Sequence, residues 1–285
     1  MIRPSLMPYL WMLMGAASFA TMGALIHALH GTLHWAVVAV VRTVLTALFA
    51  LLLAWSRGAR PVVWGPISLW VRSFAGSAAL VGVFYSLPRL PLGDTLTLTN
   101  MYPLWVTLLS WPVVRQRPSA GVWAAVACSL VGVVLLQQPH LAAGDPTVLV
   151  ALGSSMASAV ALLGLHRLHH IDPGAVVAHF SAVATAVLLG ILAAFPPPRW
   201  TPASGELLPW LMLIGVGLSA TAGQVLLTKA FAAGPPARVS VVGLTQVGFG
   251  MIFDMMFWGR RPDGLALLGV VLVTGPTAWL MLRAR

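Results

Sequence analysis

The residues between Thr95 and Trp105 combine hydroxyl, amide and aromatic side chains within an apolar neighbourhood. Thr95, Thr97 and Thr99 alternate with leucines, and a period of two is typical of a half-buried strand. On a helix, by contrast, Thr95, Thr99 and Tyr102 stand at i, i+4 and i+7 and share one face. Such a face offers hydrogen bonds and aromatic contact to a small polar molecule, so the choice between strand and helix decides its chemistry.

The composition favours a helix in a membrane. The 285 residues are 59% hydrophobic and 8% charged, with a mean hydropathy of +0.92, whereas soluble domains carry about 25% charged residues. Apolar runs such as 36–55 are long and continuous, unlike the alternating segments of a membrane barrel. We therefore expect an all-α integral membrane protein, in which helices satisfy the backbone polar groups inside the lipid bilayer.

The net charge of +10 does not indicate nucleic-acid binding, because the basic residues are scattered between apolar runs, as in membrane loops. Spans need roughly 20 apolar residues, and ten candidates are found at about 8–29, 34–55, 66–87, 94–114, 119–137, 146–168, 174–195, 208–231, 236–258 and 264–283. With the N-terminus in the cytoplasm, eleven basic residues, Arg72 among them, fall at the inner side or its margin and four at the outer side. The positive-inside rule thus predicts both termini in the cytoplasm. We expect the location to be the inner membrane of a bacterium.

The chain shows signs of an internal repeat of residues 1–140 and 141–285. A shift of 144 residues places Tyr102 on Gln246 and aligns the turns that follow these spans. Because each half holds five spans, an odd number, the second half must lie upside down relative to the first. Inverted repeats with the substrate held between them are typical of secondary transporters. We expect ten transmembrane helices, arranged as two inverted five-helix repeats around a central cavity.

Three segments carry a resemblance to a known family, namely VVRTVLTAL at 40–48, the run from DTLTLTNMYPLW to VGVVLL at 94–136, and the run from LTKAFAAGPPARVS to VVLVTG at 227–275. Through them the chain resembles EamA-type members of the drug/metabolite transporter superfamily over about residues 8–283. The resemblance implies ten helices, an inverted repeat of five, a central cavity and export of small metabolites. The family usually has a glutamate in the turn after the fourth and ninth helices, where this chain has Gln116 and Arg260.

The candidate substrate-binding residues are polar or aromatic side chains that fall within spans, namely Arg42, Tyr85, Thr99, Asn100, Tyr102, Trp105, His179, Gln224 and Gln246. An ionisable residue inside a membrane is a functional hypothesis by default. Arg42 is a candidate partner for a substrate carboxylate, with structural pairing or snorkelling as the alternative. Asp254 is a candidate for proton coupling or for binding an amine, with pairing to Arg260 or Arg261 as the alternative. For the threonines the alternative is hydrogen bonding to their own helix, and for Tyr102 the alternative is packing between helices.

Gly215, Ser219 and Gly223 recur every four residues in the eighth span, and small residues at this spacing let helices approach closely. We expect them to be packing residues.

The histidines at 27, 30 and 34, and those at 166, 169 and 170, have spacings suited to zinc, but no acidic or thiol ligand accompanies them. We therefore expect no metal site and no cofactor. No catalytic arrangement or ATP-binding motif is found, so the chain is not expected to be an enzyme, and ion coupling or exchange would drive its activity.

We expect a secondary transporter, a monomer or homodimer, that exports small amphipathic metabolites such as amino acids or their derivatives by alternating access. A proton is the candidate coupling ion. The alternative cargo is a metallophore or another carboxylate-bearing metabolite. The alternative class is a non-transporting membrane enzyme or scaffold.

Overall fold

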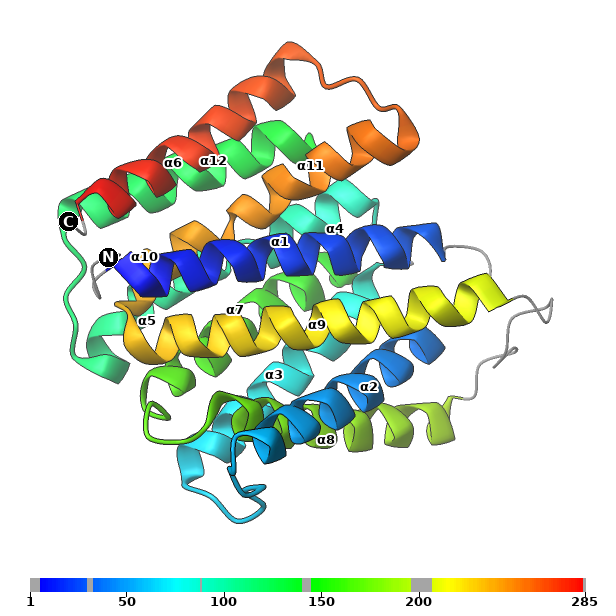
Figure 1. The fold of residues 1–285 in the computed structure, drawn as a ribbon. Helices are drawn as coiled ribbons and strands as arrows, with labels where there is room; N and C mark the ends of the chain where they lie inside the picture. The colour runs from blue at the N-terminus through cyan, green and yellow to red at the C-terminus, as the bar shows by residue number, and fades with distance from the viewer. Residues whose placement is uncertain (1–5, 30–32, 88, 140–144, 196–206, 284–285) are drawn as a thin grey trace.

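The computed structural model describes residues 6–29, 33–87, 89–139, 145–195 and 207–283. Within these ranges the chain forms twelve helices and no strand, so the alternating threonines lie on a helix. The helices are α1 (Met7–Ala28), α2 (Trp35–Ser56), α3 (Ile67–Ser86), α4 (Leu92–Thr99), α5 (Tyr102–Val114), α6 (Ala120–Gln137), α7 (Pro146–His166), α8 (Pro173–Ala194), α9 (Leu207–Ala233), α10 (Pro236–Gly243), α11 (Thr245–Trp258) and α12 (Gly264–Leu282) (Figure 1).

In the described ranges, nine helical segments are long and apolar enough to cross a membrane, and α10 with α11 counts as one of them. They match nine of the ten spans expected from the sequence. The exception is the segment 94–114, where α4 and α5 are each too short to meet this criterion. The chain is thus an all-helical, multi-pass membrane protein over the residues described.

The break between α4 and α5 has a local cause. Pro103 has no backbone N–H, so the carbonyl of Thr99 lacks the partner that a continuous helix would supply. Two side chains bond backbone carbonyls just before the break: Thr99 Oγ1 donates to the carbonyl of Thr95 at 2.8 Å, and Asn100 Nδ2 donates to the carbonyl of Leu96 at 2.7 Å. The single span expected here is therefore two short helices.

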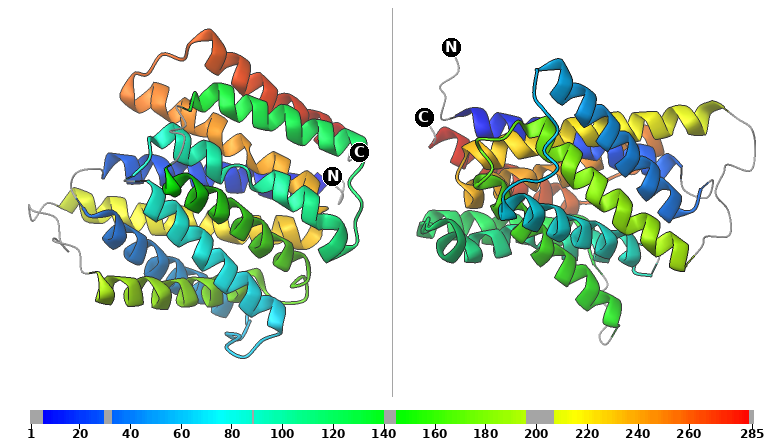
Figure 2. Two further views of the ribbon diagram at one scale, coloured as in Figure 1. Left: turned by 180° about the vertical axis from the view of Figure 1, so that it is seen from behind. Right: turned by 90° about the horizontal axis from the view of Figure 1, so that it is seen from below.

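The longest helices of each half pack on helices of the other half. The most extensive pairings are α1 with α9, α3 with α7, α6 with α12, and α2 with α8 (Figures 1 and 2). Each helix of the first half has a counterpart six helices later, so α1 corresponds to α7 and α3 corresponds to α9. Exchanging the counterparts turns the pair α1 with α9 into the pair α7 with α3. The pairs α2 with α8 and α6 with α12 map onto themselves. The packing thus has an approximate two-fold pattern.

Two of the small residues of α9 pack against α1, and the sequence predicted a packing role for both. A Cβ atom on Gly223 would lie 2.8 Å from the ring of Phe19, and one on Gly215 would lie 2.9 Å from Leu25. Both glycines lie against side chains of α1, so their lack of a side chain allows α1 and α9 to approach closely.

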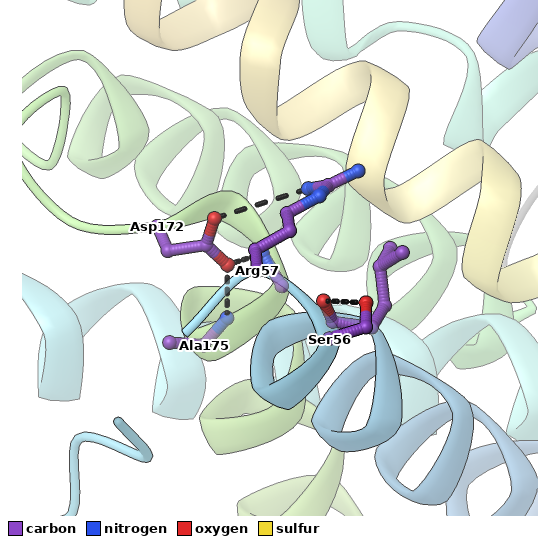
Figure 3. Close-up of polar contacts among 6 residues, drawn as sticks. Ser56, Arg57, Asp172 and Ala175 are labelled. Carbon is purple, nitrogen blue, oxygen red and sulfur yellow. Dashed lines mark hydrogen bonds and ion pairs between the residues drawn. The ribbon is translucent and has the colours of Figure 1, made fainter. Parts of the chain in front are cut away.

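Polar contacts join the end of α2 to the start of α8 (Figure 3). Asp172 caps α8, because its Oδ1 accepts hydrogen bonds from the backbone N–H groups of Gly174 at 2.8 Å and Ala175 at 3.2 Å. Its Oδ2 lies 3.8 Å from Nη1 of Arg57, which follows α2. These contacts hold the beginning of α8, the helix that carries His179 and Phe180.

Candidate functional site

Arg72 lies inside the helix bundle and not at the membrane margin, where the sequence placed it. It is on α3 and only 3% exposed. Its guanidinium lies over the ring of Phe180 on α8, with Cζ 4.2 Å from the ring centroid. Its Nη2 donates a hydrogen bond to Oε1 of Gln224 on α9 at 3.1 Å. Three helices thus hold one buried cation, and Gln224, a predicted site residue, is its partner.

His179, another predicted site residue, lies beside this group on α8. Its Nδ1 is 2.8 Å from Oγ of Ser73, the residue after Arg72, and the tautomer of the ring decides which atom donates. The ring also meets Trp70 edge to face, with centroids 4.7 Å apart. A cation, an amide, an imidazole and two aromatic rings therefore gather where α3, α8 and α9 meet.

Buried polar atoms without hydrogen-bond partners occur on the helices of this region, as they also do on α4 and α6. Within the described ranges they include Nε of Arg42 and of Arg72 and the hydroxyls of Thr46, Ser181 and Thr228. These residues belong to α2, α3, α8 and α9. A buried polar atom without a partner costs free energy, so a water molecule or a solute that bonded these atoms would stabilise the bundle.

The charge of this region is positive and unmatched. Both ion pairs found among the described residues lie at helix ends, and neither includes Arg42 or Arg72. Arg42 is partly exposed on α2. Two arginines within membrane-spanning helices and without a facing carboxylate favour binding of an anionic group.

The aromatic and polar residues around the α4–α5 break are held by other helices. The Tyr102 hydroxyl donates to the carbonyl of Ser240 on α10 at 3.3 Å, and Nε1 of Trp105 donates to Oγ of Ser155 on α7 at 2.9 Å. Thr99 and Asn100 bond carbonyls of α4, as described above. These contacts support the packing alternative for this segment. The Thr95 hydroxyl is fully buried and has no partner in the described part of the chain.

Three other predicted site residues, Tyr85, Gln246 and Asp254, are not among the described contacts of Arg72. Tyr85 is 39% exposed, and the guanidinium of Arg89 lies 3.7 Å from its ring centroid. Gln246 is half-buried on α11. Asp254 Oδ2 accepts a hydrogen bond from Nη1 of Arg260 at 3.0 Å, near the end of α11. This pairing is the alternative that the sequence left open for Asp254.

A hollow of about 580 Å³ opens where α5, α7 and α9 end, lined by Val113, Val114, Arg115, His166, Arg167, His169 and Ala232. The lining holds two arginines and two histidines and no acid. His166 Nε2 lies 3.3 Å from Nε2 of Gln116, and Nη2 of Arg167 donates to the carbonyl of Val113 at 2.6 Å. In the described ranges, no group of three or more histidine, cysteine or acidic side chains is placed to hold a metal ion.

Sequence reasoning missed Arg72 and its partner Phe180. A signal was present, since Arg72 is the charged residue inside the expected span 66–87. Its position near one end of that span favours the membrane margin when the sequence is considered alone. Phe180 carried no comparable signal, because an aromatic residue in a membrane span is ordinary.

The model of the EamA-like transporter family matches residues 6–137 and again residues 146–282. The pseudopaline exporter CntI of Pseudomonas aeruginosa (strain UCBPP-PA14) is 28% identical over 262 residues, covering 90% of this chain and 89% of that protein. Solute carrier family 35 member G1 of Mus musculus is 26% identical over 238 residues, covering 74% of this chain and 62% of its own length.

A solved crystal structure has a TM-score of 0.86 and covers 100% of this chain and 99% of its own, at 18% identity, which bears on the fold alone. The helical membrane fold agrees with the family match, which covers most of the chain in two segments. The chain therefore belongs to the EamA-like transporter family, and it is a membrane transporter rather than an enzyme.

Proposed function

We propose that the chain is a secondary transporter that exports small amphipathic metabolites, amino acids or their derivatives, by alternating access. The observation that carries this proposal is the set of partnerless polar atoms buried on α2, α3, α8 and α9. A scaffold would gain nothing from them, because each unsatisfied group destabilises a bundle in lipid. A solute path between helices gives them partners during transport.

The proposed architecture has ten spans in two inverted repeats, residues 1–140 and 141–285. The tenth span is α4 with α5, two short helices that follow each other along the chain. The exchange of packing partners between the halves and the two matches to the family model support this arrangement. Broken helices near a midplane site occur in several transporter folds, and here they fall at the α4–α5 and α10–α11 junctions.

The proposed substrate-binding residues centre on Gln224 and His179, together with Arg42 on α2, a helix that packs on α8 and α9. Thr99, Asn100, Tyr102, Trp105, Tyr85 and Gln246 remain candidates, and their contacts favour packing or surface roles in this conformation. Asp254 remains a candidate for proton coupling, although its ion pair with Arg260 favours a structural role.

A carboxylate-bearing metabolite, such as a metallophore, is the second candidate cargo. It is favoured by the arginines without facing acids and by the similarity to the pseudopaline exporters. That relative is named as an exporter, which also supports the outward direction of transport.

The proposed location is the inner membrane of a bacterium, with both termini in the cytoplasm. The basic hollow at the ends of α5, α7 and α9 would then face the cytoplasm, in line with the positive-inside rule. A monomer or a homodimer is compatible with this arrangement.

The test is flux in proteoliposomes, with labelled amino acids, their N-acetyl derivatives and pseudopaline as cargo, with and without a pH gradient. We expect saturable flux of at least one cargo. Thr46→Val, which removes a buried hydroxyl without a partner, should reduce this flux by about 2- to 10-fold, the worth of one hydrogen bond.

The matched control is Thr274→Val on α12, whose hydroxyl is exposed and bonds the carbonyl of Val270. It should transport like the wild type. Absence of saturable flux for every cargo, or equal flux for the Thr46 and Thr274 variants, would contradict the proposal.

A further inference from the structure

The guanidinium of Arg72 is enclosed by side chains and backbone of three helices. One face lies on the ring of Phe180, an arrangement that stabilises a desolvated cation. Its Nη1 fills the space above Gly76, and a Cβ atom at that position would overlap this nitrogen. Gln224 holds the other terminal nitrogen, Nη2. The side chain is therefore fixed by groups from α3, α8 and α9, and little rotamer freedom remains to be lost on binding.

The charge of this fixed cation is incompletely satisfied. The guanidinium carries five N–H donors, and in the described part of the chain its Nε has no partner. Its side-chain acceptor, Oε1 of Gln224, is neutral. A carboxylate would add a charge-assisted, bidentate pair of hydrogen bonds, which are shorter and stronger than bonds to an amide.

Arg42 is a weaker candidate for the same role. No hydrogen bond or ring contact to another helix fixes its guanidinium among the described residues, and its side chain is partly exposed. A preorganised group binds more tightly than one that must be ordered on binding. The structure therefore favours Arg72 as the anion-binding arginine.

We propose that Arg72 binds the carboxylate of the transported metabolite, and that Gln224 holds the guanidinium in place until the carboxylate arrives. The proposal rests on the proposed function and narrows the cargo to metabolites with a free carboxylate. The ring of Phe180 lies against the guanidinium of Arg72, and the ring of Trp70 lies against His179, the residue before Phe180. Both rings suit an apolar portion next to that carboxylate.

The first experiment measures equilibrium binding to the full chain in nanodiscs, with N-acetyl-L-phenylalanine and its uncharged amide as probes. Wild-type protein should prefer the acid by on the order of 10- to 100-fold, the worth of hydrogen bonds to a charged group. Arg72→Gln should lose this preference and bind the amide as before.

The matched control is Arg117→Gln, which also removes an arginine stacked on an aromatic ring, Trp111, but at an exposed position. It should keep the wild-type preference. A wild type that binds both probes equally or neither, or an Arg72→Gln variant that still prefers the acid, would overturn the proposal.

A second variant keeps the test decisive if Arg72→Gln does not fold. Gln224→Glu places a carboxylate beside Arg72 within the chain itself. It should raise the melting temperature and weaken binding of the acid at least tenfold, because the internal carboxylate occupies the guanidinium. Unchanged binding of the acid by Gln224→Glu would also overturn the proposal.

These outcomes are separable from those of the proposed function. Flux that does not discriminate between acid and amide would reject the role of Arg72 and leave the transporter proposal standing. Binding of the acid through Arg72 without any flux in proteoliposomes would reject the proposed export by alternating access and leave Arg72 as the anion-binding arginine.

Discussion

The seam between α6 and α12 depends on two glycines that face each other across the halves of the chain. A Cβ atom on Gly132 would lie 2.7 Å from the carbonyl oxygen of Gly269, and one on Gly269 would lie 2.6 Å from the carbonyl oxygen of Gly132. Both obstacles are backbone atoms, which cannot rotate out of the way as a flexible side chain can. We predict that Gly132→Ala and Gly269→Ala each destabilise the protein by separating α6 from α12.

The magnitude follows from these distances. Ordinary van der Waals contact begins at 3.4 Å, so the alanine at Gly132 requires the helices to move apart by about 0.7 Å at this point. Overpacking of this kind costs about 1–3 kcal/mol. Alanine gains roughly 0.5–1 kcal/mol over glycine within a helix, which offsets part of the loss. The net destabilisation should therefore be on the order of 1–2 kcal/mol for either variant.

The assay is thermal denaturation of the full chain in one detergent, followed by size-exclusion chromatography of the heated samples. Gly275→Ala on α12 is the matched control, because a Cβ atom there meets nothing within 4 Å. It should melt at or above the wild-type temperature. If Gly132→Ala and Gly269→Ala melt with Gly275→Ala, the close backbone approach does not hold this seam.

Three further predictions concern individual polar groups. Asp254→Asn should leave the pH dependence of flux unchanged, because Asp254 already pairs with Arg260. The pair is partly exposed, and such pairs contribute about 0–1 kcal/mol to stability. Loss of the pH dependence in this variant would make Asp254 the coupling residue. Tyr102→Phe should lower stability by about 0.5–1.5 kcal/mol without abolishing flux, since it removes the bond to the carbonyl of Ser240; loss of flux at unchanged stability would favour a binding role. The pKa of the Asp263 carboxyl is lowered from 3.8 because the carboxylate accepts a hydrogen bond from the backbone N–H of Ala266 at the start of α12. The contribution of this carboxylate to stability is therefore present above about pH 3.8 and is lost as the pH falls further. Asp263→Asn keeps a capping side chain and cannot titrate, so its melting temperature relative to wild type should rise between pH 6 and pH 2.5, and a constant difference would contradict this.

The helical membrane fold was predictable from the sequence. Low charge and long apolar runs leave only helices that satisfy their own backbone in lipid, and this outweighs the strand-like alternation of Thr95, Thr97 and Thr99. The small residues of α9 were predictable for a similar reason, since Gly215 and Gly223 lie one above the other on a helix. The break at Pro103 also has a local cause, because a missing N–H acts on the residues next to it.

The candidate site was predictable only in part. Gln224 and His179 stood out as polar residues within apolar spans, and the structure brings both to the junction of α3, α8 and α9. Tyr102 and Trp105 stood out equally, yet their polar atoms bond other helices. The sequence predicts that a polar side chain lies within a membrane span. It does not predict whether another helix supplies the hydrogen-bond partner of that side chain.

Arg72 shows most clearly which properties follow from the sequence alone and which follow from tertiary packing. Composition alone places Arg72 within the apolar span 66–87, near its margin, because the span consists of residues adjacent in the chain. Its burial, the ring of Phe180 beneath it and its bond to Gln224, 152 residues away, depend on how three helices pack. Tertiary packing therefore decides that this arginine is a fixed interior cation, because only contacts between distant segments can exclude water from the guanidinium and leave its Nε without a partner.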